Sequence, residues 1–81
     1  MIKMTAKIKL TPEEIIKRAV SFFGPGGHGL ELKEQAAGIV YFEGGGGCVE
    51  VTASAEGKVA SVSLFSREWD YQVKEFLKAI T

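Results

Sequence analysis

The chain has 81 residues, which is the size of one domain and leaves no room for two separate cores. Hydrophobic residues make up 46% and charged residues 25% of the sequence, which is typical of a folded globular protein and argues against disorder. Ten basic and ten acidic residues cancel, so the basic surplus of most nucleic-acid-binding proteins is missing.

Residues 2–10 alternate between apolar and polar side chains. This period of two predicts a strand with one buried and one wet face. The wet face carries Lys3, Thr5, Lys7 and Lys9. Lysines on an exposed strand also discourage pairing with the edge of another sheet.

A helix start follows directly. Thr11 stands at the N-cap, Pro12 at the first helical position and Glu14 at the third, which is the pattern of a capping box. Apolar residues then recur at spacings of three and four, at Ile15, Ile16, Ala19, Val20 and Phe23. We therefore expect a helix of about three turns that ends at Gly24-Pro25.

Four more strands are predicted in the middle of the chain. They cover residues 30–34, 39–42, 48–53 and 58–65, with turn signals at residues 44–47 and at Glu56-Gly57. Short turns between consecutive strands favour an antiparallel meander. In the fourth strand of the chain, Val49, Val51 and Ala53 should face inward.

The sequence closes with a second amphipathic helix, for which Ser66 is the expected cap. Its apolar stripe consists of Trp69, Val73, Phe76, Leu77 and Ile80. The predicted fold is thus a single α+β domain over residues 1–81 with the order β-α-β-β-β-β-α. We expect a five-stranded antiparallel sheet with two helices packed on one face.

Cysteine content and hydropathy restrict the cell compartment. Cys48 is the only cysteine, so neither an internal disulfide nor a cysteine-based zinc site can form. The longest apolar run spans residues 36–42 and contains Gly38, whereas a membrane span needs about 20 apolar residues. The N-terminus lacks the continuous apolar stretch of a signal peptide. We expect a cytoplasmic protein without membrane contact, cofactor or metal.

Two glycine-rich segments stand out. Residues 24–29 match the dinucleotide-binding pattern G-x-G-x-x-G, but that mechanism needs the pattern between a strand and a following helix. Here the glycines follow a helix, which favours a helix stop and a flexible loop. Residues 44–47 are four consecutive glycines, more than a hairpin turn needs. A tolerant turn and a loop that closes over a ligand both remain open.

No catalytic group is evident. His28 lies among glycines and is expected at the surface, and Cys48 is expected to be a buried, inert thiol. A Cys–His nucleophilic pair would require the two to meet in space together with a third group that orients the base. Nothing in the sequence indicates such a meeting, so we expect no enzyme.

Two surfaces are candidates for partners. Lys3, Lys7, Lys9 and Lys33 line a sheet face beside Tyr41 or Phe42 if they share one side, as in some nucleic-acid-binding sheets. The alternative is a solvated face with acidic neighbours, here Glu31 and Glu50. Residues 39–42 are apolar on both faces of their strand, so the side that the helices leave uncovered favours a homodimer contact.

The opening strand that runs into Thr11-Pro12-Glu13-Glu14, the strands between Leu30 and Phe65, and the closing helix over residues 66–80 together resemble a reduced helix-grip fold. Bet v 1-like and START-like binders of lipids and polyketides share this plan. The layout is also similar to one half of the TATA-binding protein. The resemblance covers nearly the whole chain at the level of layout and patterning, and it matches no family motif residue by residue.

The helix-grip resemblance implies an apolar ligand between the sheet and the last helix. Our leading hypothesis is a non-enzymatic binding or assembly module that self-associates as a homodimer and holds a small apolar ligand there. Its contacts would be Tyr41, Phe42, Trp69 and His28. The alternative hypothesis is a nucleic-acid-binding dimer that uses the Lys3/Lys7/Lys9 face, although the balanced charge makes nucleic acid the less favoured partner.

Overall fold

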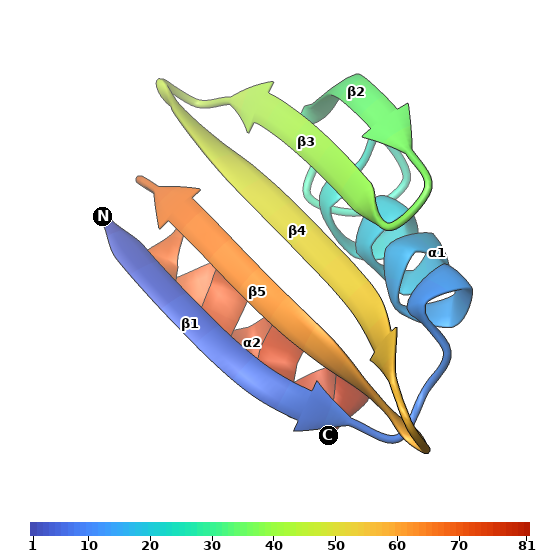
Figure 1. Ribbon diagram of the computed structural model, residues 1–81. Helices are drawn as coiled ribbons and strands as arrows, with labels where there is room; N and C mark the ends of the chain where they lie inside the picture. Colours follow the sequence, from blue (N-terminus) through green and yellow to red (C-terminus); the bar gives the residue numbers. More distant parts are fainter.

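The computed structural model describes residues 1–81 and confirms the α+β class and the element order (Figure 1). The elements are β1 (Ile2–Ile8), α1 (Pro12–Phe23), β2 (Glu31–Ala36), β3 (Ile39–Gly44), β4 (Gly47–Glu56), β5 (Val59–Arg67) and α2 (Asp70–Ile80). Neither helix has the length and apolar character that a membrane-spanning segment needs.

All five strands form one antiparallel sheet in the order β1-β5-β4-β3-β2. Strands β2 to β5 follow one another as hairpins. The first strand of the chain, β1, pairs with the last, β5. This pairing makes β1 and β2 the two edges. Figure 1 shows both helices behind the same face, so the domain is a slab of two layers whose Cα atoms span 36 × 21 × 16 Å.

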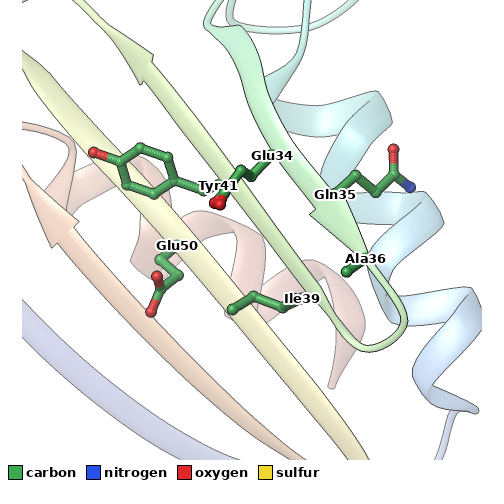
Figure 2. Close-up of a pocket in the computed structure, with 6 residues that line it drawn as sticks. All are labelled: Glu34, Gln35, Ala36, Ile39, Tyr41 and Glu50. Atoms are coloured by element: carbon green, nitrogen blue, oxygen red, sulfur yellow. The ribbon is translucent and has the colours of Figure 1, made fainter.

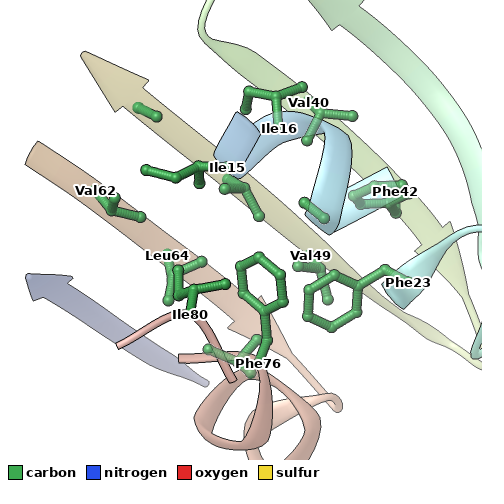
Figure 3. Close-up of a cluster of buried hydrophobic side chains, with 14 of the residues drawn as sticks. Ile15, Ile16, Phe23, Val40, Phe42, Val49, Val62, Leu64, Phe76 and Ile80 are labelled. Atoms are coloured by element: carbon green, nitrogen blue, oxygen red, sulfur yellow. The ribbon is translucent and has the colours of Figure 1, made fainter. Parts of the chain in front are cut away.

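The core lies between the sheet and the helices (Figure 3). α1 buries Ile15, Ile16, Ala19 and Phe23, and α2 buries Val73, Phe76 and Ile80. These side chains meet the inward residues of the strands, among them Val49, Val51 and Ala53 as predicted. The ring of Phe23 is the meeting point, with centroids 5.3 Å from Phe76 and 5.7 Å from Phe42.

Several element boundaries differ from the sequence prediction, and β3, β4 and β5 end two or three residues later than predicted. β1 ends at Ile8, which leaves Lys9 beyond the strand. β2 begins at Glu31 and continues to Ala36. The last helix begins at Asp70, so Ser66 does not open it.

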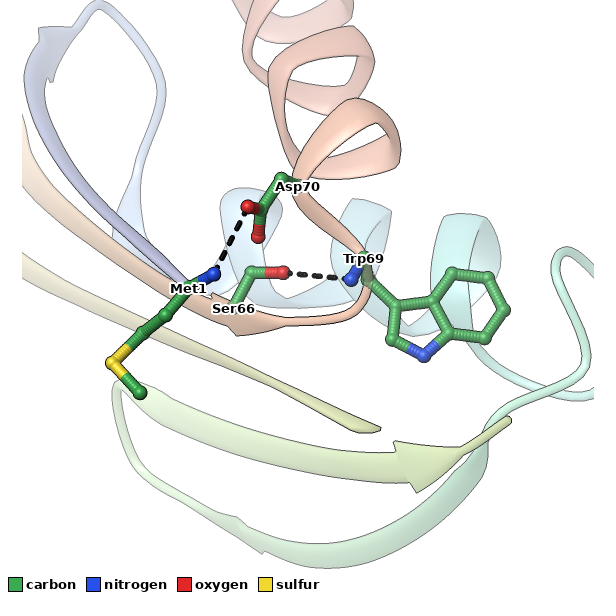
Figure 4. Close-up of polar contacts among 4 residues, drawn as sticks. All are labelled: Met1, Ser66, Trp69 and Asp70. Carbon is green, nitrogen blue, oxygen red and sulfur yellow. Dashed lines mark hydrogen bonds and ion pairs between the residues drawn. The ribbon is translucent and has the colours of Figure 1, made fainter. Parts of the chain in front are cut away.

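Ser66 lies in β5, fully buried, where it pairs with Ile2 on one side and Val49 on the other. Its hydroxyl still accepts a hydrogen bond from the Trp69 N–H at 3.2 Å (Figure 4). The turn from β5 to α2 passes through Glu68 at a φ of 69°. Strand pairing on both sides therefore outweighs the capping tendency of this serine.

Because the core lies on one side of the sheet only, the same Ile→Val substitution should lower the free energy of unfolding by different amounts on the two sides. Ile15→Val removes a methylene from a fully buried side chain and should cost about 0.5–1.5 kcal/mol of unfolding free energy. Ile39→Val removes the same group from a half-buried side chain on the face without helices and should cost below about 0.5 kcal/mol. Urea unfolding of dilute protein measures both, and equal costs would contradict a core on one face only.

Candidate functional site

The structure separates the four predicted ligand contacts into two groups. His28 and Trp69 come together on the helix side, with ring centroids 6.0 Å apart, and His28 also meets Phe22 edge to face, with centroids 4.9 Å apart. Phe42 lies on the same side, fully buried in the core. Tyr41 faces the opposite side, because successive residues of β3 alternate between the two faces.

The space that the prediction reserved for an apolar ligand is occupied by side chains. Val73, Phe76 and Ile80 of α2 are at most 6% exposed, and they belong to one continuous cluster with Val62 and Leu64 of the sheet. Close packing of this kind is what a small domain needs for stability. The helix side therefore serves as the core.

The first glycine segment completes the C-terminus of α1. The backbone N–H of His28 donates to the carbonyl of Phe22 and that of Leu30 to the carbonyl of Phe23, both at 2.9 Å. Gly27 passes so close that a Cβ atom would overlap the Phe22 carbonyl oxygen. The segment thus satisfies helix carbonyls that would otherwise lack partners.

The second glycine segment is the hairpin turn from β3 to β4. Gly44 pairs with Gly47, and both central residues have positive φ, 58° at Gly45 and 81° at Gly46, as a type I′ turn requires. The indole N–H of Trp69 donates to the Gly44 carbonyl at 2.8 Å, and a Cβ on Gly45 would lie 3.0 Å from the indole ring. Packing against Trp69 accounts for part of this glycine run.

Trp69→Phe keeps an aromatic ring but removes the indole N–H, which leaves the Gly44 carbonyl without this donor. We expect a loss of about 1 kcal/mol in unfolding free energy. Tyr71→Phe is the matched control, since it also removes one side-chain hydrogen bond, to Glu75, but from a residue that is 70% exposed. Denaturant unfolding of both variants is the measurement, and an equal effect would contradict the anchoring role of Trp69.

No nucleophilic pair is assembled. Cys48 is 3% exposed and alternates with the core residue Val49, so it faces the side without helices, whereas His28 lies with the aromatic rings on the helix side. No three side chains of the His, Cys, Asp and Glu types lie close enough together to hold a metal ion.

The sheet face opposite the helices has no covering layer, and we call it the open face. Cross-strand partners share a face, so the strand registers define its members. They are Lys3, Thr5 and Lys7 of β1; Val59, Ser61, Ser63, Phe65 and Arg67 of β5; Cys48, Glu50, Thr52, Ser54 and Glu56 of β4; Ile39, Tyr41 and Glu43 of β3; and Glu31, Glu34 and Ala36 of β2.

Charge is distributed unevenly across the open face. In one cross-strand row, Lys3 of β1 pairs with Phe65, Phe65 with Glu50, Glu50 with Tyr41 and Tyr41 with Glu34 of β2. The row thus runs from a base at one edge to an acid at the other. We call Lys3 and Lys7 of β1 the basic rim, and Glu31, Glu34, Glu43 and Glu50 the acidic rim.

The basic rim is shorter than the lysine row that the sequence suggested. Lys3 and Lys7 lie on the strand, whereas Lys9 lies beyond its end. Lys7 forms an ion pair with Glu56, and Lys33 lies on the other edge strand, paired with Glu31 at 3.1 Å. The lysines therefore do not form one continuous basic surface.

Tyr41 lies at the centre of the acidic rim, between Glu34 and Glu50 (Figure 2). Its hydroxyl donates to Oε2 of Glu43 at 2.9 Å. This bond, together with a contact to Cys48, raises the pKa of Tyr41 well above its ordinary value of 10.0. The hydrogen bond and the charge of Glu31 likewise raise the pKa of Lys33.

Two hollows open on either side of Tyr41. One, of about 420 Å³, is lined by Glu34, Ile39 and Glu50 among others (Figure 2). The other, of about 430 Å³, includes Glu43 and Arg67. Both are open to solvent, whereas small-molecule sites usually enclose most of their ligand. This geometry suits a flat macromolecular contact better than an enclosed ligand.

The raised pKa of Tyr41 has a definite consequence for pH dependence. The folded chain holds the phenol proton more tightly than the unfolded chain does, so the stabilisation is complete below about pH 10 and is lost as the pH rises through the folded pKa. Glu43→Gln replaces the carboxylate that accepts the hydrogen bond from the Tyr41 hydroxyl with a neutral, weaker acceptor and also removes the nearby negative charge. It should therefore move the Tyr41 titration to lower pH.

Absorbance titration in a Tyr71→Phe background isolates Tyr41, because the chain has two tyrosines. Glu31→Gln is the control, since its carboxylate is on the same face but does not bond to Tyr41. An unchanged Tyr41 midpoint in Glu43→Gln would contradict the assignment of the carboxylate as the cause.

Sequence reasoning missed Phe65 and Arg67 as members of this surface. The signal was present, because every second residue of β5 from Val59 to Arg67 avoids the core. What the sequence lacked was the strand order that brings these residues between Lys3 and the acidic rim.

Comparison with protein-family models, with curated proteins and with solved structures finds no match to this chain. The resemblance to helix-grip proteins and to the TATA-binding protein therefore rests on the layout of elements and stays a prediction.

Proposed function

We propose that this protein is a non-enzymatic assembly module that forms a homodimer through its open face. The observation that carries the proposal is that one complete face of a five-stranded sheet has no covering layer, while the helices fill the other face. Sheets in small domains commonly bury one face and leave the other to solvent or to a second layer. Which of the two applies depends on how charged and how apolar the residues of the face are.

The middle of the open face is low in charge. One complete row consists of Thr5, Ser63, Thr52, Ile39 and Ala36, and Phe65 adds an aromatic ring in the row beside it. By contrast, the outer surface of the helices carries exposed charges such as Lys17, Arg18 and Lys74. Interface centres are depleted in charge and rich in aromatic residues, and rims are polar. The open face has this arrangement, with Glu50 as the central exception.

The sheet edges are poor alternatives for self-association. β1 presents lysines, and β2 carries a register shift between Leu32 and Glu34. Charged edge residues and bulges both work against the addition of another strand. The flat face is therefore the favoured contact, rather than a continuous sheet through two copies.

The size of the face sets the expected strength. A contact over four of the five strands, at a spacing of about 4.8 Å and a length of about six residues, has a flat footprint of about 400 Å² per copy. Stable complexes bury about 800 Å² per partner. We therefore expect weak dimerisation, with a Kd between about 10 µM and 1 mM.

Two other functions fit less well. A nucleic acid bound to Lys3 and Lys7 would meet Glu50, Glu43 and Glu34 on the same face, and phosphates are repelled by carboxylates. An apolar ligand beneath α2 would have to displace side chains of the core.

Phe65→Glu should abolish the self-association of a protein that otherwise dimerises, because it places a charge in the centre of the contact. Sedimentation equilibrium between about 10 µM and 1 mM should show the mass of the wild type rising from 8.8 kDa toward twice that value. The variant should stay at the mass of one chain throughout.

Tyr71→Glu is the matched control, because it puts the same charge on an exposed aromatic residue of α2. Phe65→Ser serves if the glutamate variant does not fold, and it should weaken the dimer in the same direction. A wild type that remains monomeric up to about 1 mM would refute the proposed function.

A further inference from the structure

We infer that the second copy docks with its two-fold axis parallel to the strands and between β4 and β5, so that the basic rim of each copy lies over the acidic rim of the other. This inference rests on the proposed function and adds to it the orientation of the partner and the residues that select it. It follows from the symmetry of a dimer and from the charges on the open face.

The charges of the open face are separated and largely without partners inside the chain. The five ion pairs of the protein do not involve Lys3, Arg67, Glu34 or Glu50. Lys3 lies on β1, Arg67 on β5, and the acids on β2 to β4. The face therefore carries free positive charge toward one edge and free negative charge toward the other, although the net charge of the chain is zero.

A symmetric face-to-face dimer can place its axis in two principal directions between the sheets. An axis across the strands puts β1 over β1, so that the lysines of the two β1 strands face each other and acids face acids. An axis parallel to the strands exchanges the two sides of the sheet and keeps position along the strands. Only the second choice places base over acid, and like-charge contact is costly in an interface.

The rows of the sheet and the area of overlap then decide where the axis lies. An axis directly over β4 would place Glu50 on its own copy. An axis directly over β5 would place Lys3 over Glu50, but only β1, β5 and β4 would be in contact, which is less area than four overlapping strands bury. An axis between β4 and β5 places β1 over β3 and β5 over β4, so Lys3 lies over Tyr41, flanked by Glu50 and Glu34 in the same row. Neighbouring strands are about 4.8 Å apart, which a lysine side chain can reach.

The same placement fits the rest of the face. Ser63 lies over Thr52, which brings two small hydroxyl side chains together near the axis. Phe65 lies over Glu50, whose carboxylate turns toward the lysine of the partner. Facing sheets are about 10 Å apart, and an aligned arrangement of this kind has the geometry of a β-sandwich.

Charge reversal tests the orientation. In the inferred dimer, Lys3→Glu and Glu50→Lys each place like charges together twice, once for each copy. Either single variant should weaken dimerisation about tenfold. The double variant Lys3→Glu/Glu50→Lys again places opposite charges together at these two positions with the same net charge as the wild type. It should recover part of the affinity that either single variant loses, since position 3 still lies beside Glu34.

Lys74→Glu makes the same charge change as Lys3→Glu on an exposed position of α2, and it should leave the affinity unchanged. Higher ionic strength should weaken the wild type and the double variant alike. Circular dichroism of each variant confirms that it is folded.

The outcomes separate the inference from the proposed function. If both single variants dimerise more weakly than the wild type and the double variant dimerises more strongly than either, the inferred orientation is supported. A wild-type dimer that neither single variant weakens overturns the orientation and leaves the proposed function intact, because an axis across the strands never brings Lys3 of β1 over Glu50 of β4. A double variant weaker than both single variants also overturns it. A wild type without any dimer overturns both.

Discussion

The pairing of β1 with β5 is the interaction on which the rest of the structure depends. It joins the first strand of the chain to the last, so β5 becomes an interior strand and β1 an edge. The connection from β1 through α1 and the connection from β5 to α2 then both pass over the same face. This pairing also buries Ser66 between two neighbours, which holds the residue in the strand and delays the start of α2.

The two glycine-rich segments of the sequence have structural roles next to the core. The glycines after α1 let the chain turn back and hydrogen-bond to the carbonyls at the end of the helix, and the glycines between β3 and β4 let a tight turn pack against Trp69. His28 is exposed, and its ring meets Phe22 edge to face and lies 6.0 Å from the ring of Trp69. Features that suggest a ligand loop in the sequence are thus explained by packing in a domain that has little interior to spare.

The open face is the surface on which the proposed dimerisation rests. Its charge separation is invisible in the composition, because equal numbers of acidic and basic residues cancel. It appears only when the registers place Lys3, Phe65, Glu50, Tyr41 and Glu34 in one row across the sheet. In the dimer that we propose, this separation of charge would favour one docking orientation of the second copy over another, without a pocket or a catalytic group.

The sequence by itself determined the elements and which residues of each share a face, because the periods of 2 and 3.6 residues and the cap at Thr11 act over a few neighbours. It also placed Tyr41 and Phe42 on adjacent positions of one strand, which alternation necessarily sends to opposite faces. Only the tertiary structure decided that β1 lies beside β5, that Ser66 belongs to a strand, and that Arg67 and Phe65 join the site. The physical reason is that strand order and register depend on contacts between distant parts of the chain, which no local pattern records.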